Sequence, residues 1–209
     1  MAKKGLAIIV SAPSGTGKTT VCARLRERMP GLRFKVSHTT RPPREGEVDG
    51  VHYHFISESE FQRRLKEGDF LEWARVHGHY YGTARQTVED HLQRGEDLLM
   101  ELDVQGVASL RAMEFDGVFI FILPPSLEEL EKRLMKRGTE PPEKIRQRLE
   151  TAKAEIIRYR LYDYVVTNHE VDDTVETVQT ILKSEPFRSH RFQPESPDIQ
   201  ALIKTQVSV

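Results

Sequence analysis

The sequence has little cysteine, almost no net charge and no long apolar run, and each absence narrows what the chain can be. Cys22 is the one cysteine among 209 residues, which excludes an internal disulfide and a zinc site built from several cysteines. The 31 basic and 32 acidic side chains leave a net charge of −1, so the whole chain has no bias toward nucleic acid or an anionic membrane. No apolar run approaches the length that spans a bilayer. These features predict a soluble, cytoplasmic protein without a nucleic-acid or membrane partner.

The sequence does contain a glycine-rich loop of the kind that binds phosphate. Residues 11–20 (SAPSGTGKTT, the phosphate loop) match the right half of the pattern G-x-x-x-x-G-K-[ST] at Gly15, Gly17, Lys18 and Thr19. Ala12 stands where the first glycine is usual, and we expect the loop to tolerate it. A β-branched apolar run precedes the loop and an amphipathic helical pattern follows it. Strand, loop and helix in this order direct backbone N–H groups and a helix dipole at an anion, so we expect phosphate binding.

Apolar runs and helical patterns alternate along most of the chain, which predicts an α/β fold with a mostly parallel five-stranded sheet and helices on both faces. We expect core strands at 6–10, 34–37, 97–102, 118–123 and 163–167. We expect helices near 18–29, 57–67, 84–94, 105–113, 126–137, 141–160 and 171–184. Capping boxes predict two helix starts, at Ser57-x-x-Glu60 and Ser126-x-x-Glu129.

Two segments interrupt the alternation and suggest a division into parts. Residues 38–83 contain short aromatic-rich runs and several glycines, and predict a small inserted α+β lobe. Residues 133–150 are strongly charged around Gly138 and two prolines, and predict a mobile helical lid. Residues 186–209 predict a peripheral tail with a short helix at 198–205. The core would then comprise residues 1–37, 84–132 and 151–185.

The lobe opens with a run that resembles a known family. Residues 37–55, SHTTRPPREGEVDGVHYHF, contain the pattern T-T-R-x-x-R-x-G-E-x-x-G-x-x-Y-x-F, which is the signature of the guanylate kinase family. Further matches are FLEW at 70–73, YYGT at 80–83, ELDVQG at 101–106 and the arginine-rich lid. The resemblance covers about residues 6–184 in the family's order.

The resemblance implies a P-loop kinase core, a lobe that binds the nucleoside monophosphate and a lid over the ATP. It further implies transfer of the γ-phosphoryl group of Mg·ATP to GMP, and also to dGMP, giving ADP and GDP for purine nucleotide supply. ATP and GMP would be the partners and Mg²⁺, carried as Mg·ATP, the cofactor. The oligomeric state stays open.

The resemblance also assigns roles to individual residues. The ATP-binding residues would be Ala12, Pro13, Ser14, Gly15, Thr16, Gly17, Lys18, Thr19, Thr20 and, on the adenine side, Asn168. The GMP-binding residues would be Ser37, Arg41, Arg44, Tyr53, Glu72, Tyr81, Gly82, Thr83, Glu101 and Asp103. The catalytic residues would be Lys18, Arg41, Arg133, Arg137 and Arg148, with Thr19 and Asp103 at the magnesium.

These residue types suit that chemistry. Guanine presents two N–H donors on its Watson–Crick edge, and the acceptor-only carboxylate of Glu72 can accept from both, whereas it would repel the N1 acceptor of adenine. The planar forks of Arg41 and Arg44 suit phosphate oxygens. Glu101 and Asp103 follow an apolar strand at the sheet edge where ligands gather. Which of the two carboxylates serves magnesium and which faces guanine is left open by the sequence.

The lid arginines have two interpretations. Arg133 and Arg137 lie four residues apart, as do Lys144 and Arg148, so an anion between such like charges would stabilise the lid helices. Glu129 also lies four residues before Arg133, which predicts a surface ion pair that is compatible with an open lid.

Two other functions compete with the kinase interpretation. A non-catalytic interaction module related to this family would typically lack a competent phosphate loop, whereas Lys18 and Thr19 are intact here. A P-loop kinase for another acceptor, such as a ribose phosphate, would lack the base-reading carboxylate, whereas Glu72 and Asp103 are present.

Overall fold

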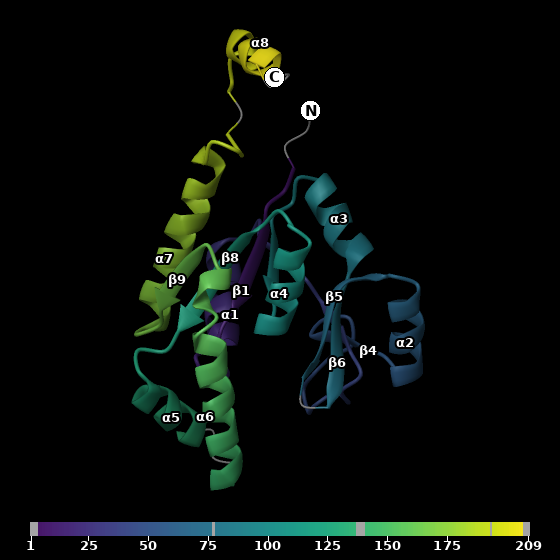
Figure 1. Cartoon of the computed structure of the whole chain (residues 1–209), viewed down its shortest axis with the longest axis vertical. Coiled ribbons are helices and arrows are strands. Elements are labelled where there is room, and N and C mark those ends of the chain that lie inside the picture. The colour runs from purple at the N-terminus through teal and green to yellow at the C-terminus, as the bar shows by residue number, and fades with distance from the viewer. Residues whose placement is uncertain (1–3, 77, 137–140, 193, 207–209) are drawn as a thin grey trace. The chain divides into compact units, whose positions relative to one another are not determined.

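The chain forms two compact units, Met1–Val175 and Glu176–Val209, in a computed structural model that describes residues 4–76, 78–136, 141–192 and 194–206. The first unit contains both β-sheets and the phosphate loop (Figure 1). In the part of the chain that the structure describes, no helix is both long and apolar enough to cross a membrane.

Five parallel strands form the central sheet of the first unit, in the order β2-β7-β1-β8-β9. They are β1 (Ala7–Ser11), β2 (Arg33–Phe34), β7 (Leu98–Glu101), β8 (Val118–Leu123) and β9 (Tyr164–Thr167). Strands β1 and β8 are apolar and almost entirely buried, because helices cover both faces of a parallel sheet. The predicted fold class, an α/β core with a five-stranded parallel sheet, is confirmed.

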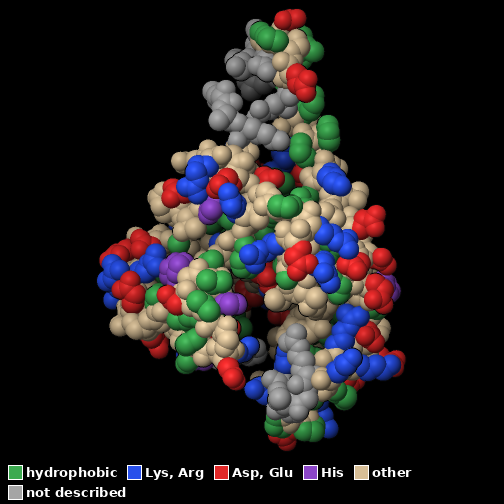
Figure 2. Space-filling view, turned by 180° about the vertical axis from the view of Figure 1, so that it is seen from behind, with side chains coloured by type: hydrophobic (Ala, Val, Ile, Leu, Met, Phe, Trp, Pro, Cys, Tyr) green, Lys and Arg blue, Asp and Glu red, His purple; other side chains and the backbone are tan. Residues whose placement is uncertain are grey.

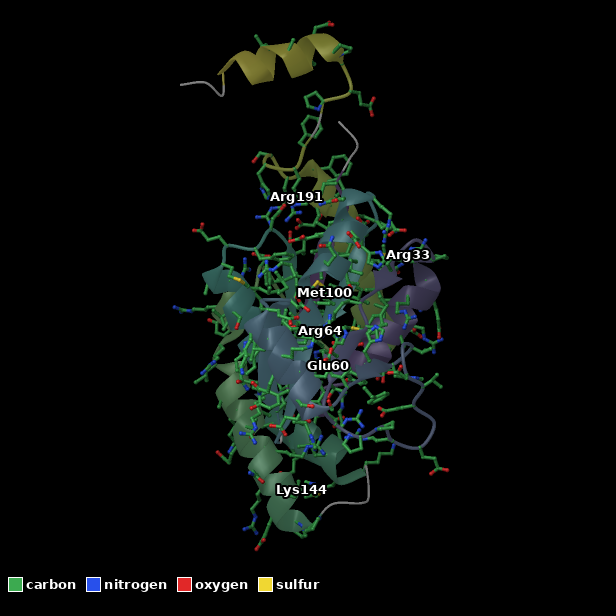
Figure 3. The ribbon with its side chains drawn as sticks, turned by 90° about the vertical axis from the view of Figure 1, so that its right-hand side faces the viewer. Arg33, Glu60, Arg64, Met100, Lys144 and Arg191 are labelled. Atoms are coloured by element: carbon green, nitrogen blue, oxygen red, sulfur yellow. The ribbon has the colours of Figure 1, made fainter. Side chains whose placement is uncertain are left out.

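Helices pack on both faces of this sheet, where α1 (Lys18–Arg28), α3 (Arg85–Gln93) and α4 (Val104–Ala112) contact its strands. The first unit also contains α5 (Leu127–Lys136), α6 (Pro142–Ile156), a 3-10 turn at Tyr159–Leu161 and the start of α7 (Val171–Ser184). Ile9, Met100 and Phe119 are register partners that pack in one buried cluster with residues of α3 and α4. Figure 3 labels Met100 within this core. Alternate strand residues point to the opposite face, where α1 contacts β1 and β7.

The inserted lobe has a four-stranded sheet of its own, in the order β4-β3-β6-β5. Its strands are β3 (Ser37–Thr39), β4 (Tyr53–Phe55), β5 (Phe70–Val76) and β6 (His79–Ala84), and its helix is α2 (Glu58–Lys66). Phe61 of α2 is fully buried and stacks on Phe70, with ring centroids 4.4 Å apart. A Cβ on Gly82 of β6 would lie 2.8 Å from the Phe70 ring, so the absence of a side chain there permits this close packing.

The prediction of a single core strand at 34–37 is wrong. Lys35 N donates to Leu99 O at 2.9 Å, which is the last contact of this segment with β7. The chain then leaves the central sheet, and Ser37 begins β3 in the sheet of the lobe. An alternating pattern does not reveal this change, because it is compatible with either sheet.

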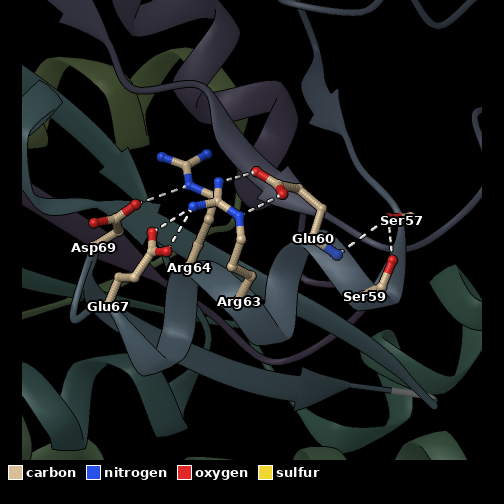
Figure 4. A network of polar contacts seen from close by, with 7 residues as sticks. All are labelled: Ser57, Ser59, Glu60, Arg63, Arg64, Glu67 and Asp69. Atoms are coloured by element: carbon tan, nitrogen blue, oxygen red, sulfur yellow. Dashed lines mark hydrogen bonds and ion pairs between the residues drawn. The ribbon is translucent and has the colours of Figure 1, made fainter.

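Both predicted capping boxes begin a helix. Ser57 Oγ accepts from Glu60 N at 3.1 Å, and Ser126 Oγ accepts from Glu129 N at 3.0 Å. In α2 the glutamate side chain turns away from the cap and pairs with Arg63, which also contacts Glu67 (Figure 4). These ion pairs are more than a third exposed and contribute little to stability.

The second unit comprises the rest of α7, a 3-10 turn (Glu185–Phe187) and α8 (Pro197–Gln206), so the predicted tail helix is confirmed. Glu185 is fully buried, and its carboxylate lies 3.5 Å from Arg188 Nη1 and 3.3 Å from Arg191 Nε. These arginines stabilise a buried charge that would otherwise be costly.

Candidate active site

The phosphate loop joins the end of β1 to the start of α1 and requires its glycines. Gly15 and Gly17 have φ of 92° and 101°, in the left-handed region that other residues rarely adopt. A Cβ on Gly15 would lie 2.7 Å from Leu134 Cδ2, and a Cβ on Gly17 would lie 2.8 Å from Asn168 Nδ2. Gly17 is also the N-cap of α1 and provides no side-chain cap. The loop therefore presents backbone N–H groups at a helix N-terminus, which is an anion site.

A cavity of about 450 Å³ lies over this loop and takes in most of the residues expected to bind ATP. It is lined by Ala12, Pro13, Ser14, Gly15, Gly17, Lys18, Thr19, Thr20, Arg75, Val76, Asp103, Gln105, Gln147, Arg148, Thr151 and Glu155. The surface is hollowed between the lobe and the α5–α6 pair, which lie at the left and right of the view in Figure 2.

Three polar side chains from distant segments hold the loop from outside. Arg148 Nη2 donates to Ser14 Oγ at 2.6 Å. Arg133 Nη1 donates to Thr16 O at 3.3 Å, while its Nε forms the predicted pair with Glu129 at 2.8 Å. Asn168 Nδ2 donates to Thr16 O at 2.7 Å. These contacts place Arg133, Arg148 and Asn168 beside the loop.

Asn168 is expected on the adenine side, and its amide has both ends engaged within the protein. Its Oδ1 accepts from Thr174 Oγ1 at 2.9 Å, its Nδ2 donates to the loop, and the side chain is buried. In this conformation Asn168 supports the loop backbone. Arg137, predicted as a lid arginine, lies outside the described residues.

A second pocket, of about 220 Å³, adjoins the phosphate loop on the side of the lobe. It is lined by Lys18, Ser37, Tyr53, Glu72, Ala74, Val76, Tyr81, Gly82, Glu101, Leu102 and Asp103. Lys18 lines both this pocket and the cavity over the loop, and its Nζ donates to Leu102 O at 3.1 Å. The ammonium group of the loop therefore lies where the two spaces meet.

Glu72 is a buried carboxylate in the wall of the second pocket. Burial raises the pKa of Glu72, while Lys35 and a hydrogen bond from Thr83 act in the opposite direction. A Cβ on Gly106, in the first turn of α4, would lie 2.5 Å from Glu72 Oε2. Glycine at that position thus lets the carboxylate lie against the positive end of a helix.

Arg41, Arg44 and the two tyrosines meet at the mouth of this pocket, in a wider space of about 530 Å³. Glu47 Oε1 lies 2.8 Å from Arg41 Nη2, and Glu47 Oε2 accepts from Arg44 N at 2.7 Å. Hydrogen bonding to Glu47 raises the pKa of Arg41, and hydrogen bonding to Arg41 lowers the pKa of Glu47. Tyr53 and Tyr81 are packed edge to face, with ring centroids 5.9 Å apart.

Oxygen ligands suited to magnesium lie next to Lys18. Thr19 Oγ1 donates to Glu101 Oε2 at 3.4 Å, and Asp103 lines both the cavity and the second pocket. Hydroxyl and carboxylate oxygens are the ligands that Mg²⁺ prefers, so the residues present fit this ion. Asp103 also caps α4, because its Oδ1 accepts from Gly106 N at 2.8 Å.

Sequence reasoning missed several polar residues of the site, among them Lys35 and Glu47 in the wider space and Arg75, Gln105, Gln147, Thr151 and Glu155 in the cavity over the loop. Lys35 is a charged residue inside an expected core strand, and that anomaly was a signal that could have found it. Glu47 belongs to the signature run and could have been paired with Arg41 only by knowing how the loop folds back.

The phosphate loop begins a helix, and its lysine lies between a cavity and a pocket lined by carboxylates. This arrangement is typical of a P-loop kinase of small phosphorylated substrates. The family described as "Guanylate kinase" matches residues 4–185, and the chain belongs to that family. The predicted family, enzyme class and guanylate kinase function are thereby confirmed.

Individual relatives agree with this assignment. A guanylate kinase of Clostridium perfringens (strain SM101 / Type A) is 46% identical over 190 residues, covering 91% of this chain and 88% of the relative. One of Caldanaerobacter subterraneus subsp. tengcongensis is 48% identical over 189 residues, covering 90% and 92%. The crystal structure of guanylate kinase from Anaplasma phagocytophilum superposes with a TM-score of 0.77 at 30% identity, covering 100% of this chain and 98% of that one.

Proposed function

We propose that the chain transfers the γ-phosphoryl group of Mg·ATP to GMP, and to dGMP, around Lys18, giving ADP and GDP. The observation that carries this assignment is the position of Lys18, which lines both the cavity over the phosphate loop and the pocket that contains Glu72. Two anionic substrates bound in these spaces would meet at one ammonium group. This is the arrangement that direct phosphoryl transfer requires.

The ATP triphosphate would lie on the backbone N–H groups of the phosphate loop, with Lys18 at the β- and γ-phosphates. Thr19 would ligate magnesium directly, with Asp103 and Glu101 holding the ion through water. When bound, the ion would neutralise charge on the phosphates. Asn168 and Arg133 would keep the loop in shape through the Thr16 carbonyl.

GMP would bind with its base in the second pocket and its phosphate at the pocket mouth. Glu72 would accept from N1–H and N2–H₂ of guanine, with Ser37 beside the same edge. Thr83 is fully buried and does not line this pocket, so it would act on the base through its hydrogen bond to Glu72. The phosphate would lie among the guanidinium groups of Arg41 and Arg44 and the hydroxyls of Tyr53 and Tyr81. Gly82 lines this pocket without a side chain.

In the reaction, an oxygen of the GMP phosphate attacks the γ-phosphorus, and the bond from the γ-phosphorus to the bridging oxygen breaks. The electron pair of that bond leaves with ADP. No enzyme intermediate forms and no strong base is needed, because the acceptor is already an anion at neutral pH. Lys18 and the arginines Arg41, Arg133, Arg137 and Arg148 would neutralise the transferring charge, after closure of the lobe (38–83) and the lid (133–150) over the core excludes water.

ATP and GMP are small metabolites of the cytoplasm, and the free, buried Cys22 is compatible with that compartment. We therefore place the reaction there, with the two nucleotides as the partners and no role for nucleic acid or a membrane.

The test is ADP production by the purified protein with Mg·ATP and, separately, GMP, dGMP, AMP, CMP, UMP and dTMP. We expect fast turnover with GMP, weaker turnover with dGMP, and little with the other four, all of it abolished by a chelator of magnesium. Tight GMP binding without turnover would instead favour a binding module, and preference for another acceptor would refute the GMP assignment.

Gly106→Ala provides a check on the position of Glu72. Alanine favours a helix by about 1 kcal/mol over glycine, which offsets part of the cost of moving the buried Glu72, so we expect the variant to remain folded. The added Cβ would lie 2.5 Å from Glu72 Oε2 and displace the carboxylate, so we expect KM for GMP to rise about tenfold with little change in KM for ATP. Thermal melting and steady-state kinetics measure both effects. An unchanged KM for GMP would show that Glu72 is not held where GMP binds.

A further inference from the structure

Lys35 is a fully buried lysine that lies where the chain crosses from the central sheet to the lobe. Its side chain is 2% exposed, and its Nζ donates to Ser37 Oγ and to Thr83 Oγ1, each at 2.7 Å. Thr83 in turn donates to the carboxylate of Glu72. The chain thus places an ammonium group behind Ser37 and Glu72, which line the second pocket, and this group reaches Glu72 through the fully buried Thr83.

The hydrogen bonds of Lys35 fix the direction of its neighbours' protons. A lysine ammonium only donates, so both hydroxyls must accept from it and direct their own protons elsewhere. The proton of Thr83 is directed to Glu72. The proton of Ser37 is left for a group in the pocket that Ser37 lines. The pocket therefore presents an acceptor, Glu72, beside a donor, Ser37.

Charge acts in the same direction. The groups that face Lys35 are Glu72 on β5, Lys18 on α1, Glu101 at the end of β7 and Asp103 at the start of α4. Burial lowers the pKa of Lys35 to about 8, so the ammonium form persists at neutral pH. Lys35 opposes the effect of burial and of Asp103 on Glu72, and so favours the ionised carboxylate there.

We infer that Lys35 is a specificity-determining positioning residue, which polarises Ser37, Thr83 and Glu72 so that the pocket complements the edge of guanine. Guanine O6 is an acceptor and suits the Ser37 proton, while N1–H and N2–H₂ are donors and suit the ionised Glu72. Adenine reverses this order, with a donor at N6 and an acceptor at N1. The inference rests on the proposed function of Glu72 and Ser37 in binding GMP.

The experiment compares Lys35→Met, which removes charge and donors, with Lys35→Gln, which keeps an amide donor. We expect Lys35→Met to raise KM for GMP about tenfold at neutral pH and to change kcat at saturating GMP by less than about twofold. We also expect the acidic limb of kcat/KM for GMP to move upward by about one pH unit, since Glu72 without the cation takes up its proton at higher pH. In Lys35→Gln the acidic limb of kcat/KM for GMP should also move upward, but KM for GMP should rise less than in Lys35→Met.

Controls separate positioning from folding and from the function itself. Lys66→Met makes the same change on the exposed surface of α2 and should move neither KM nor the limb. Titration of the GMP phosphate is common to all variants and cancels in the comparison. In a Glu72→Gln background, Lys35→Met should no longer move the limb. Melting curves identify any unfolded variant, in which case Lys35→Gln, the smaller change, carries the test.

The two proposals fail in distinguishable ways. If the acidic limb stays at the wild-type position in both Lys35 variants, the inference is overturned even where KM rises, because a structural role alone explains that rise. If Glu72→Gln leaves discrimination between GMP and AMP unchanged, the proposed base-reading function itself fails.

Discussion

Replacing Lys18 with alanine is expected to lower kcat about 10³-fold, which corresponds to about 4 kcal/mol of transition-state stabilisation. Lys18 lines both the cavity over the phosphate loop and the second pocket, so in the proposed reaction its ammonium would face the phosphoryl group as charge moves from one substrate to the other. In the proposed function GMP is held mainly by Glu72 and the arginines of the lobe, so its affinity should change less than about threefold. Single-turnover phosphoryl transfer measures the first effect and calorimetric titration with GMP measures the second.

The Lys18 prediction has a matched control variant and an outcome that would refute it. Lys66→Ala removes a lysine from the exposed surface of α2 and should leave kcat unchanged. Because the Lys18 ammonium makes one hydrogen bond to the backbone, at Leu102 O, the variant should melt close to the wild type. Wild-type turnover in Lys18→Ala would remove the phosphate loop from the mechanism.

The features that local sequence determines could be predicted. The glycines of the phosphate loop and the serine caps at Ser57 and Ser126 depend on a few adjacent residues, and the structure has them at the expected positions. The same holds for the ion pair of Glu129 with Arg133, which depends only on helical spacing. The family signature in 37–55 similarly identified residues that line the second pocket and the wider space at its mouth.

Features that depend on contacts between distant segments could not be predicted. Lys35 belongs to the site because the chain passes from one sheet to the other directly after β2. The alternation of apolar and polar residues at 34–37 fits either sheet, so it does not reveal this change. Glu47 belongs to it because its loop folds back on Arg41. The hydrogen bond from Asn168 to Thr16, more than a hundred residues away, likewise depends on where the segment that follows β9 lies relative to the phosphate loop.

Replacing Glu72 with glutamine is expected to lower kcat/KM for GMP about 10³-fold, or about 4 kcal/mol, while the low activity with AMP changes little. Thr83 accepts from Lys35 and must direct its own proton at residue 72, so the amide oxygen of glutamine would take that hydrogen bond. The amide NH₂ would then face the N–H donors of guanine. The amide NH₂ and the guanine N–H groups are all donors, so two buried donors would face each other where the ionised carboxylate had accepted. Leaving buried donors without an acceptor costs more than the loss of one hydrogen bond.

The measurement is the ratio of kcat/KM for GMP to that for AMP, together with the same ratio for IMP, which keeps O6 and N1–H but lacks the 2-amino group. In the variant, kcat/KM should fall less for IMP than for GMP, because IMP has one fewer N–H donor facing the new amide NH₂. Glu58→Gln makes the same exchange on the exposed first turn of α2 and should leave all three activities unchanged. An equal loss for GMP, IMP and AMP would mean that residue 72 shapes the lobe without reading the base, whereas a loss graded by the number of N–H donors would identify the carboxylate as the group that selects guanine.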